Sequence, residues 1–174
     1  MNHQPTPNFT YKAYVAGKWN EPEVVRQVQQ AFRDRGYTIT HDWTSLEGTQ
    51  DKHLMSKEEL AKFRAKCAEL DINGVKEADV VFVIMTDKDY AYRGTFTEIG
   101  CALGLEKIVI LVCPSDDYQC ATNCFFHHPD ILRVKTVEEG LAIWWRPESK
   151  TSAPIQSPVP YQTPRPQPQK QKAA

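Results

Sequence analysis

Short apolar runs alternate along this chain with longer segments whose apolar residues recur at helical spacing. The strongest runs are Val80–Met85 and Ile108–Val112, which are continuous and rich in β-branched residues, as buried strands are. Weaker runs at Tyr11–Ala16, Tyr37–Thr40 and Ile131–Val134 predict three further strands, the last at an edge of the sheet. The pattern therefore predicts five strands.

The segments between these strands carry helix signals. Pro22 suits the first position of a helix that ends near Gly36. Ser56–Glu59 forms a capping box that opens a second helix, which we expect to reach a turn at Asp71–Val75. Thr95 is a predicted N-cap for the third helix.

Strands that alternate with helices indicate a largely parallel sheet covered on both faces. After a last helix over 136–145, the elements fit an α/β fold: a flavodoxin-like or Rossmann-like three-layer α/β/α sandwich. Its five-stranded, mostly parallel sheet would have the order 2-1-3-4-5. The loops at 17–19, 41–43 and 87–98 would then meet at one crevice, where the first three strands end.

Composition divides the chain into three parts. Residues 11–146 contain nearly all of the apolar runs and predict one globular domain. Residues 1–10 are polar and are predicted to be a flexible N-terminus. Residues 147–174 hold seven of the 12 prolines among Gln, Ser and Lys, which predicts a disordered tail.

The charge and hydropathy of the chain exclude several classes of partner. The net charge is −1 and no basic stripe is visible, so we expect no binding to nucleic acid. No apolar run approaches the roughly 20 residues that span a bilayer, and Met1–Pro5 lacks the blocks of a signal peptide. We therefore expect a soluble cytoplasmic protein that does not bind membranes.

The cysteines give a weak signal for metal. Five cysteines at irregular spacing do not predict a disulfide framework. Cys120 and Cys124, with His127 and His128, overlap the spacing of zinc ligands, but no second cysteine pair accompanies them. We expect neither a metal nor another cofactor.

Glu98 has two interpretations. It lies three residues after Thr95, where a glutamate can close a capping box by accepting a hydrogen bond from the amide of the N-cap. It also follows a buried strand, at the edge where open α/β sheets bind their ligands.

The residues expected around the crevice suit chemistry at an N-glycosidic bond. A carboxylate beside a sugar can attack the anomeric carbon, and a second carboxyl group with a raised pKa can protonate the departing base. Trp19 and Trp43 can stack on a flat base, with core packing as the alternative for each. The chain has no Gly-rich phosphate loop and no Ser-His-Asp pattern.

Three segments resemble the nucleoside 2'-deoxyribosyltransferase family. They are Tyr14–Trp19, Asp71–Val75 and Gly94–Gly100, in that order and spacing. The resemblance covers residues 11–145 and implies a nucleoside deoxyribosyltransferase-like domain at 11–146 with the five-stranded fold described above.

The resemblance also implies roles for single residues. Glu98 would be the nucleophile that forms a glycosyl ester, Tyr14 would hold its carboxylate, and Asp71 would move a proton to or from the base. Gly17 would allow the sugar or base to approach closely. Asn123 would contact sugar hydroxyls from a neighbouring subunit of a homo-oligomer. Ordinary alternatives are a core tyrosine, a helix-end carboxylate and a solvated loop amide.

One departure from the family concerns the nucleobase. Many members carry an acidic residue just before the loop glycine, where this chain has Tyr92 and Arg93. Asp87 or Asp89 can substitute, and Arg93 can pair with a phosphate. The predicted substrate-binding residues are Gly17, Trp19, Asp42, Trp43, Arg93, Gly94 and Asn123.

The expected function is N-glycosyl transfer or hydrolysis on a (deoxy)nucleoside or nucleoside monophosphate through Glu98, with a free nucleobase as product or second substrate. Two alternatives stay open. The chain can be a catalytically inactive, nucleotide-sensing module of the same fold. It can also be an NAD glycohydrolase, because related folds use a glutamate to cleave nicotinamide from ribose.

Overall fold

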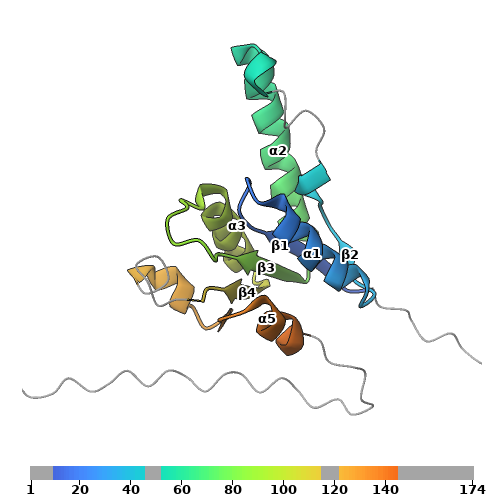
Figure 1. Cartoon of the computed structure of the whole chain (residues 1–174), viewed down its shortest axis with the longest axis vertical. Coiled ribbons are helices and arrows are strands. Elements are labelled where there is room, and N and C mark those ends of the chain that lie inside the picture. Colours follow the sequence, from blue (N-terminus) through green and yellow to red (C-terminus); the bar gives the residue numbers. More distant parts are fainter. Residues whose placement is uncertain (1–9, 46–51, 115–121, 145–174) are drawn as a thin grey trace, which may run out of the picture.

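The computed structural model describes residues 10–45, 52–114 and 122–144. The predictions for residues 1–9, for the tail at 147–174 and for Cys120 concern parts of the chain outside these ranges. Within the described part, a central sheet carries helices on both faces (Figure 1).

All five predicted strands are present and form one parallel sheet in the order β2-β1-β3-β4-β5. The strands are β1 (Lys12–Ala16), β2 (Thr38–Ile39), β3 (Val80–Ile84), β4 (Ile108–Val112) and β5 (Ile131–Val134). Every residue of the central strand β3 is buried, which explains why its sequence is continuously apolar. The predicted fold class and strand order are confirmed.

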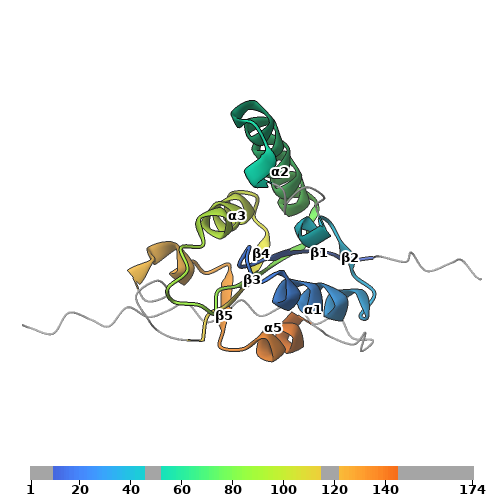
Figure 2. The same ribbon diagram turned by 45° about the horizontal axis from the view of Figure 1, so that its top comes forward.

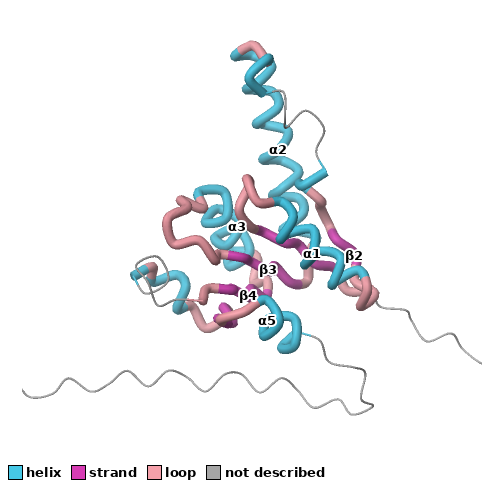
Figure 3. The backbone as a smooth tube through the Cα atoms, viewed as in Figure 1, coloured by secondary structure: helices cyan, strands magenta, loops and turns pink. Residues whose placement is uncertain are grey.

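The helices form the two outer layers. Figure 2 shows α1 and α5 on one face of the sheet and α2 and α3 on the other. The helices are α1 (Pro22–Arg33), α2 (Lys57–Glu77), α3 (Arg93–Gly104) and α5 (Val137–Trp144), with short 3₁₀ turns η1 (Trp43–Ser45), η2 (Lys52–Leu54) and η3 (Cys124–His127). The amino-terminal half of α2 extends well beyond the sheet (Figure 3).

Helix α2 begins as predicted but ends later. The Ser56 hydroxyl accepts from the Glu59 amide at 3.2 Å, and the Glu59 carboxylate accepts from the Ser56 amide at 2.8 Å, so the capping box is formed. The turn predicted at Asp71–Val75 is wrong, because α2 runs unbroken to Glu77. A Cβ at Gly74 would lie 2.8 Å from the Tyr14 ring. The glycine therefore serves close packing of helix on strand.

The start of helix α3 also differs from the prediction. The residue before the helix is Tyr92, which has a φ of 45° in the left-handed region, and Thr95 lies inside the first turn. The N-cap role predicted for Thr95 is therefore wrong. Its hydroxyl donates instead to the carbonyl of Gly17 at 3.4 Å, which links α3 to the loop after β1.

Two further observations bear on the cysteines and on membranes. Cys113, directly after β4, is disulfide-bonded, a bond that the irregular spacing of the cysteines did not predict. Among the described residues, no helix is long and apolar enough to cross a bilayer.

Candidate active site

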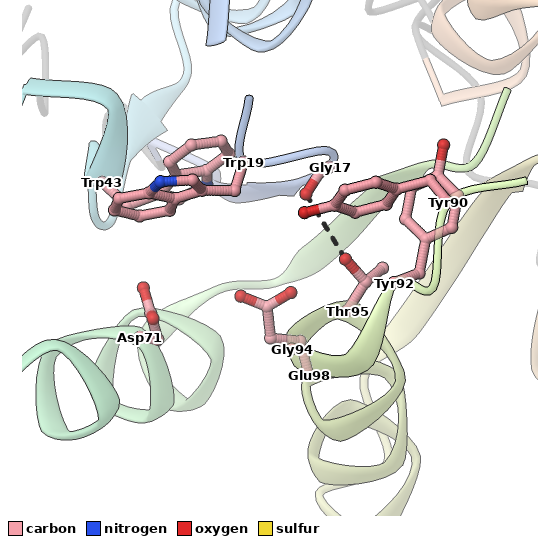
Figure 4. A pocket seen from close by; sticks show the side chains of 9 residues that line it. All are labelled: Gly17, Trp19, Trp43, Asp71, Tyr90, Tyr92, Gly94, Thr95 and Glu98. Atoms are coloured by element: carbon pink, nitrogen blue, oxygen red, sulfur yellow. Dashed lines mark hydrogen bonds between the residues drawn. The ribbon is translucent and has the colours of Figure 1, made fainter. Parts of the chain in front are cut away.

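A cavity of about 110 Å³ lies at the carboxyl ends of β1 and β3. Figure 4 shows two tryptophans facing two carboxyl groups across it, with two tyrosines at one end. The lining residues are Gly17, Trp19, Trp43, Asp71, Tyr90, Tyr92, Gly94, Thr95 and Glu98. The loops after the first three strands therefore meet here, together with α2 and α3.

Three polar side chains from three different elements meet below this cavity. The hydroxyl of Tyr14, on β1, lies 2.6 Å from Oε1 of Glu98 on α3. The same hydroxyl lies 3.1 Å from Oδ1 of Asp71 on α2. Tyr14 is itself fully buried, so its ring is fixed in the core while its hydroxyl serves both carboxyl groups. The three predicted catalytic residues thus lie together.

The position of Glu98 decides between its two interpretations. Because α3 begins at Arg93, Glu98 lies in the second turn of the helix, beyond reach of a cap. Its side chain lies against Tyr14 and lines the cavity. The capping interpretation is wrong.

Burial is the largest influence on the pKa values of this cluster. Desolvation raises the pKa of Glu98 to about 7, the hydrogen bond from Tyr14 lowers it, and the charge of Asp71 raises it. Desolvation also raises the pKa of Asp71, against smaller lowering effects of Tyr14 and His41. Desolvation and the two carboxylates keep the pKa of Tyr14 above its ordinary range, so its hydroxyl stays protonated.

The proton count of the cluster follows from these contacts. Tyr14 has one hydroxyl proton, and two carboxyl oxygens lie within hydrogen-bond distance of its oxygen. Both contacts can be hydrogen bonds only if one carboxyl group carries a proton. The contacts, 2.6 Å to Glu98 and 3.1 Å to Asp71, allow that proton to lie on either carboxyl group. In that state the two carboxyl groups share one proton, and the Tyr14 hydroxyl bridges them.

His41 is a site residue that the sequence analysis did not select. It follows β2, and its Nε2 atom lies 3.5 Å from Oδ1 of Asp71. That nitrogen is buried and has no hydrogen-bond partner among the described residues. Its place directly after a strand, in a loop already expected at the crevice, was the only signal that could have found it. His41 thus places an imidazole nitrogen beside the Asp71 carboxyl group.

The aromatic walls combine predicted and unexpected residues. The rings of Trp19 and Trp43 stack with centroids 5.5 Å apart. The Trp43 indole donates to the carbonyl of Val15 at 2.9 Å, which holds a buried ring in a fixed orientation. At the other end, Tyr90 and Tyr92 pack edge to face at 4.8 Å. These tyrosines were not selected, because nothing in their spacing marks them as facing a ligand.

Three predicted binding residues do not line the cavity. The Asp42 carboxylate accepts from Nη2 of Arg33 at 3.1 Å and from neighbouring backbone, so it organises the loop. Arg93 is exposed at the first position of α3. The Asn123 side chain accepts from the Phe125 amide at 3.1 Å, which caps η3.

The two acidic candidates for base recognition, Asp87 and Asp89, also lie outside the lining of the cavity. The Asp87 carboxylate lies 2.5 Å from the ammonium of Lys18. Its second oxygen accepts from the Asp89 amide at 2.9 Å. Neither aspartate lines the cavity.

Comparison with known proteins identifies the family of this chain. The family described as nucleoside 2-deoxyribosyltransferase matches residues 13–136, which carry all three clustered catalytic candidates. The chain belongs to this family. The match confirms the resemblance that the sequence motifs indicated.

A solved structure supports the fold independently. The CMP N-glycosidase BcmB of Clostridium botulinum aligns with a TM-score of 0.51 at 16% identity. The alignment covers 76% of this chain and 96% of that one. No curated protein matches the chain significantly. At this identity the neighbour establishes the shared fold, and its substrate is a property of that protein.

Proposed function

We propose that this chain cleaves the N-glycosidic bond of a (deoxy)nucleoside or nucleoside monophosphate through a covalent glycosyl–Glu98 intermediate. The observation that carries the proposal is the placement of the Glu98 carboxyl group, which lines the cavity. Its Oε1 atom lies 2.6 Å from the Tyr14 hydroxyl, and Asp71 contacts the same hydroxyl. A nucleophile and an acid of opposite protonation state are what displacement at an anomeric carbon requires.

In the first step, a carboxylate oxygen of Glu98 bonds to the anomeric carbon as the carbon–nitrogen bond to the base breaks. The bonding electron pair leaves with the base nitrogen, which takes the proton held by Asp71. Tyr14 keeps its own proton and orients the attacking carboxylate. The products are a free nucleobase and a glycosyl ester of Glu98.

In the second step, water or a second nucleobase attacks the same carbon and releases the Glu98 carboxylate. The incoming nucleophile gives its proton to the Asp71 carboxylate, which restores the starting state. Water as acceptor gives hydrolysis, and a base as acceptor gives transfer. Both outcomes keep the configuration at the anomeric carbon because each step inverts it once.

The walls of the cavity support a flat, apolar-faced group as part of the substrate. Trp19 is 40% exposed beside the buried Trp43 and offers a surface on which a base can stack. Arg93 stands next to Gly94, which lines the cavity, so a substrate phosphate at this rim would have a cation nearby. The family match and the CMP N-glycosidase neighbour support the same substrate class.

The proposal includes assembly and location. Asn123 lies outside the cavity of its own chain, which suits the expected role across the interface of a cytoplasmic homo-oligomer. Sedimentation of wild type tests whether the chain forms an oligomer. Mixing an Asn123→Ala variant with a Glu98→Ala variant and measuring activity tests whether Asn123 acts across the interface. Restored activity in the mixture supports a shared site; no restoration contradicts it.

The central test is a product assay. Wild-type protein is incubated with a pool of nucleosides, nucleoside monophosphates and NAD, with and without a second free base, and products are identified by mass spectrometry. We expect release of a base, and new nucleosides only if transfer operates. Glu98→Gln should abolish turnover, and intact-protein mass should show a glycosyl adduct on wild type alone.

The exposed Glu138 on α5 provides the matched control, since Glu138→Gln changes a similar carboxyl group away from the cavity. Equal turnover in the Glu98→Gln variant and in wild type would overturn the proposal. Release of nicotinamide from NAD alone would identify the glycohydrolase instead.

A nucleotide-sensing module is the second candidate, because Asp87, which could have taken over base recognition, is paired with Lys18. Calorimetric titration with the same nucleotide pool distinguishes the two. Tight binding without any product supports sensing.

A further inference from the structure

Two loops that border the cavity are joined by an ion pair between Lys18 and Asp87. Lys18 lies on the loop after β1, and Asp87 lies on the loop between β3 and α3; their charged atoms are 2.5 Å apart. The side chains of Lys18 and Asp87 are only 13% and 35% exposed. Gly17 and Trp19, on either side of Lys18, both line the cavity.

The Asp87 end of this pair is anchored within its own loop. Its backbone amide donates to the hydroxyl of Tyr92 at 3.0 Å, and its second carboxylate oxygen accepts from the Asp89 amide at 2.9 Å. Tyr92 holds the left-handed position from which α3 begins, and α3 carries Glu98. The pair is thus connected to the helix that presents the proposed nucleophile.

The Lys18 end is held from two further sides. Its ammonium lies 2.6 Å from the Glu21 carboxylate and 5.3 Å from the centre of the Tyr90 ring, a wall of the cavity. Hydrogen bonds to Asp87 and Glu21 raise the pKa of Lys18, and the hydrogen bond to Lys18 lowers that of Asp87. Both groups therefore stay ionised across the physiological range.

We propose that the Lys18–Asp87 ion pair holds the 17–21 and 86–92 loops together beside the cavity, and that Lys18 is a positioning residue for substrate binding. The inference rests on the proposed function for its kinetic consequence, but the coupling of the two loops is a property of the protein without substrate. Trp19 and Tyr90, which lie on opposite loops, are placed relative to each other by this contact. Its loss would separate the walls while leaving the Tyr14–Glu98 cluster in place.

A double-mutant cycle tests the pair. Lys18→Met keeps the aliphatic stem, and Asp87→Asn keeps an oxygen for the Asp89 amide. Each single variant should raise KM about tenfold with kcat changed less than about threefold, and the double variant should resemble the singles, since either change breaks the same contact. Multiplied effects in the double variant would overturn the coupling.

A second readout does not depend on turnover. Hydrogen–deuterium exchange of the full chain should become faster in both the 17–21 and 86–92 segments in either single variant, although only one loop is mutated. Lys62→Met, which breaks the exposed Lys62–Glu58 pair on α2, should leave both segments unchanged. Faster exchange confined to the mutated loop would overturn the proposal. If wild type turns over no substrate, the proposed function fails while this measurement still decides on the loops.

Discussion

Two groups of residues at the cavity contain carboxyl groups whose pKa values shift in opposite directions. We call Tyr14, Asp71 and Glu98 the floor of the cavity, and the Lys18–Asp87 pair its rim. On the floor, Glu98 and Asp71 share a tyrosine hydroxyl, and burial raises the pKa of both. At the rim, Asp87 contacts the Lys18 ammonium, and the pKa of this carboxyl group is lowered. A carboxyl group next to a cation is a permanent charge that can hold loops, whereas one buried beside a neutral hydroxyl can exchange a proton.

After the loss of turnover expected for Glu98→Gln, the next largest effect is expected for Asp71→Asn, which removes a carboxyl proton beside Tyr14. Asp71→Asn cannot protonate the departing base, so kcat/KM for nucleoside cleavage should fall about 10³-fold. The decline of wild-type activity at high pH, where the Asp71–Glu98 pair loses its shared proton, should disappear in the variant. A pH profile of kcat/KM measures both effects. A profile that keeps its alkaline limb would show that another group supplies the proton.

Glu98 should make stability depend on pH. Its pKa in the folded protein is about 7, raised from 4.5, so folding favours the neutral form. The stabilisation is therefore complete below pH 4.5 and is lost as pH rises through about 7. Relative to Glu98→Gln, the free energy of unfolding of wild type should fall by about 3 kcal/mol from pH 4 to pH 8. Urea titration at several pH values tests this, and a constant difference contradicts it.

Gly74→Ala should push helix α2 away from strand β1 without changing any charge. The added methyl group would lie 2.8 Å from the Tyr14 ring and from Cβ of His41, so α2 must move away from β1. We expect a loss of about 2 kcal/mol in the free energy of unfolding. Gly100→Ala on α3, where a Cβ meets nothing within 4 Å, is the matched control. Equal stability of the two variants would show that this close packing is relaxed in solution.

Tyr14→Phe removes the hydroxyl that the two floor carboxyl groups share. Its hydrogen bond lowers the pKa of Glu98, so that pKa should rise above about 7 in the variant. Activity at pH 7 should fall about tenfold and recover in part at higher pH. The acidic limb of the kcat/KM profile reports the shift. A limb at the wild-type position would mean that Tyr14 does not influence Glu98.

The smallest effect is expected for Glu21→Gln at the rim. Glu21 is the more exposed partner of Lys18, and the contact with Asp87 remains when it is neutralised. KM and kcat should stay within about twofold of wild type, since exposed ion pairs contribute little. Steady-state kinetics measure this. A tenfold rise in KM would show that Glu21, and not Asp87, orients Lys18.

Local sequence signals predicted those elements whose cause is local. Val80–Ile84 and Ile108–Val112 are strands because both faces of a parallel sheet are buried, and a buried strand is recognisable from its continuous apolar run. The capping box at Ser56 needs only contacts three residues apart. The strand order followed from the alternation of strands and helices together with the handedness of crossovers.

The predictions that were wrong concern contacts between distant segments. A glycine at position 74 is typical of a turn, but here it allows the helix to pack closely on the Tyr14 ring. Tyr14 lies 60 residues earlier in the chain. Thr95 has the chemistry of an N-cap, yet the left-handed Tyr92 begins α3 earlier and directs Thr95 to Gly17. Local propensity could not anticipate either contact.

The sequence by itself determined the alternation of strands and helices, the edge of the sheet where the site lies, and the acidic residue types available there. Only the tertiary structure decided which carboxyl groups meet a tyrosine and which meets a lysine. The physical reason is that the pKa and the role of a carboxyl group depend on burial and on neighbours within a few ångströms. Those neighbours come from β1, α2 and α3, which are far apart in the chain.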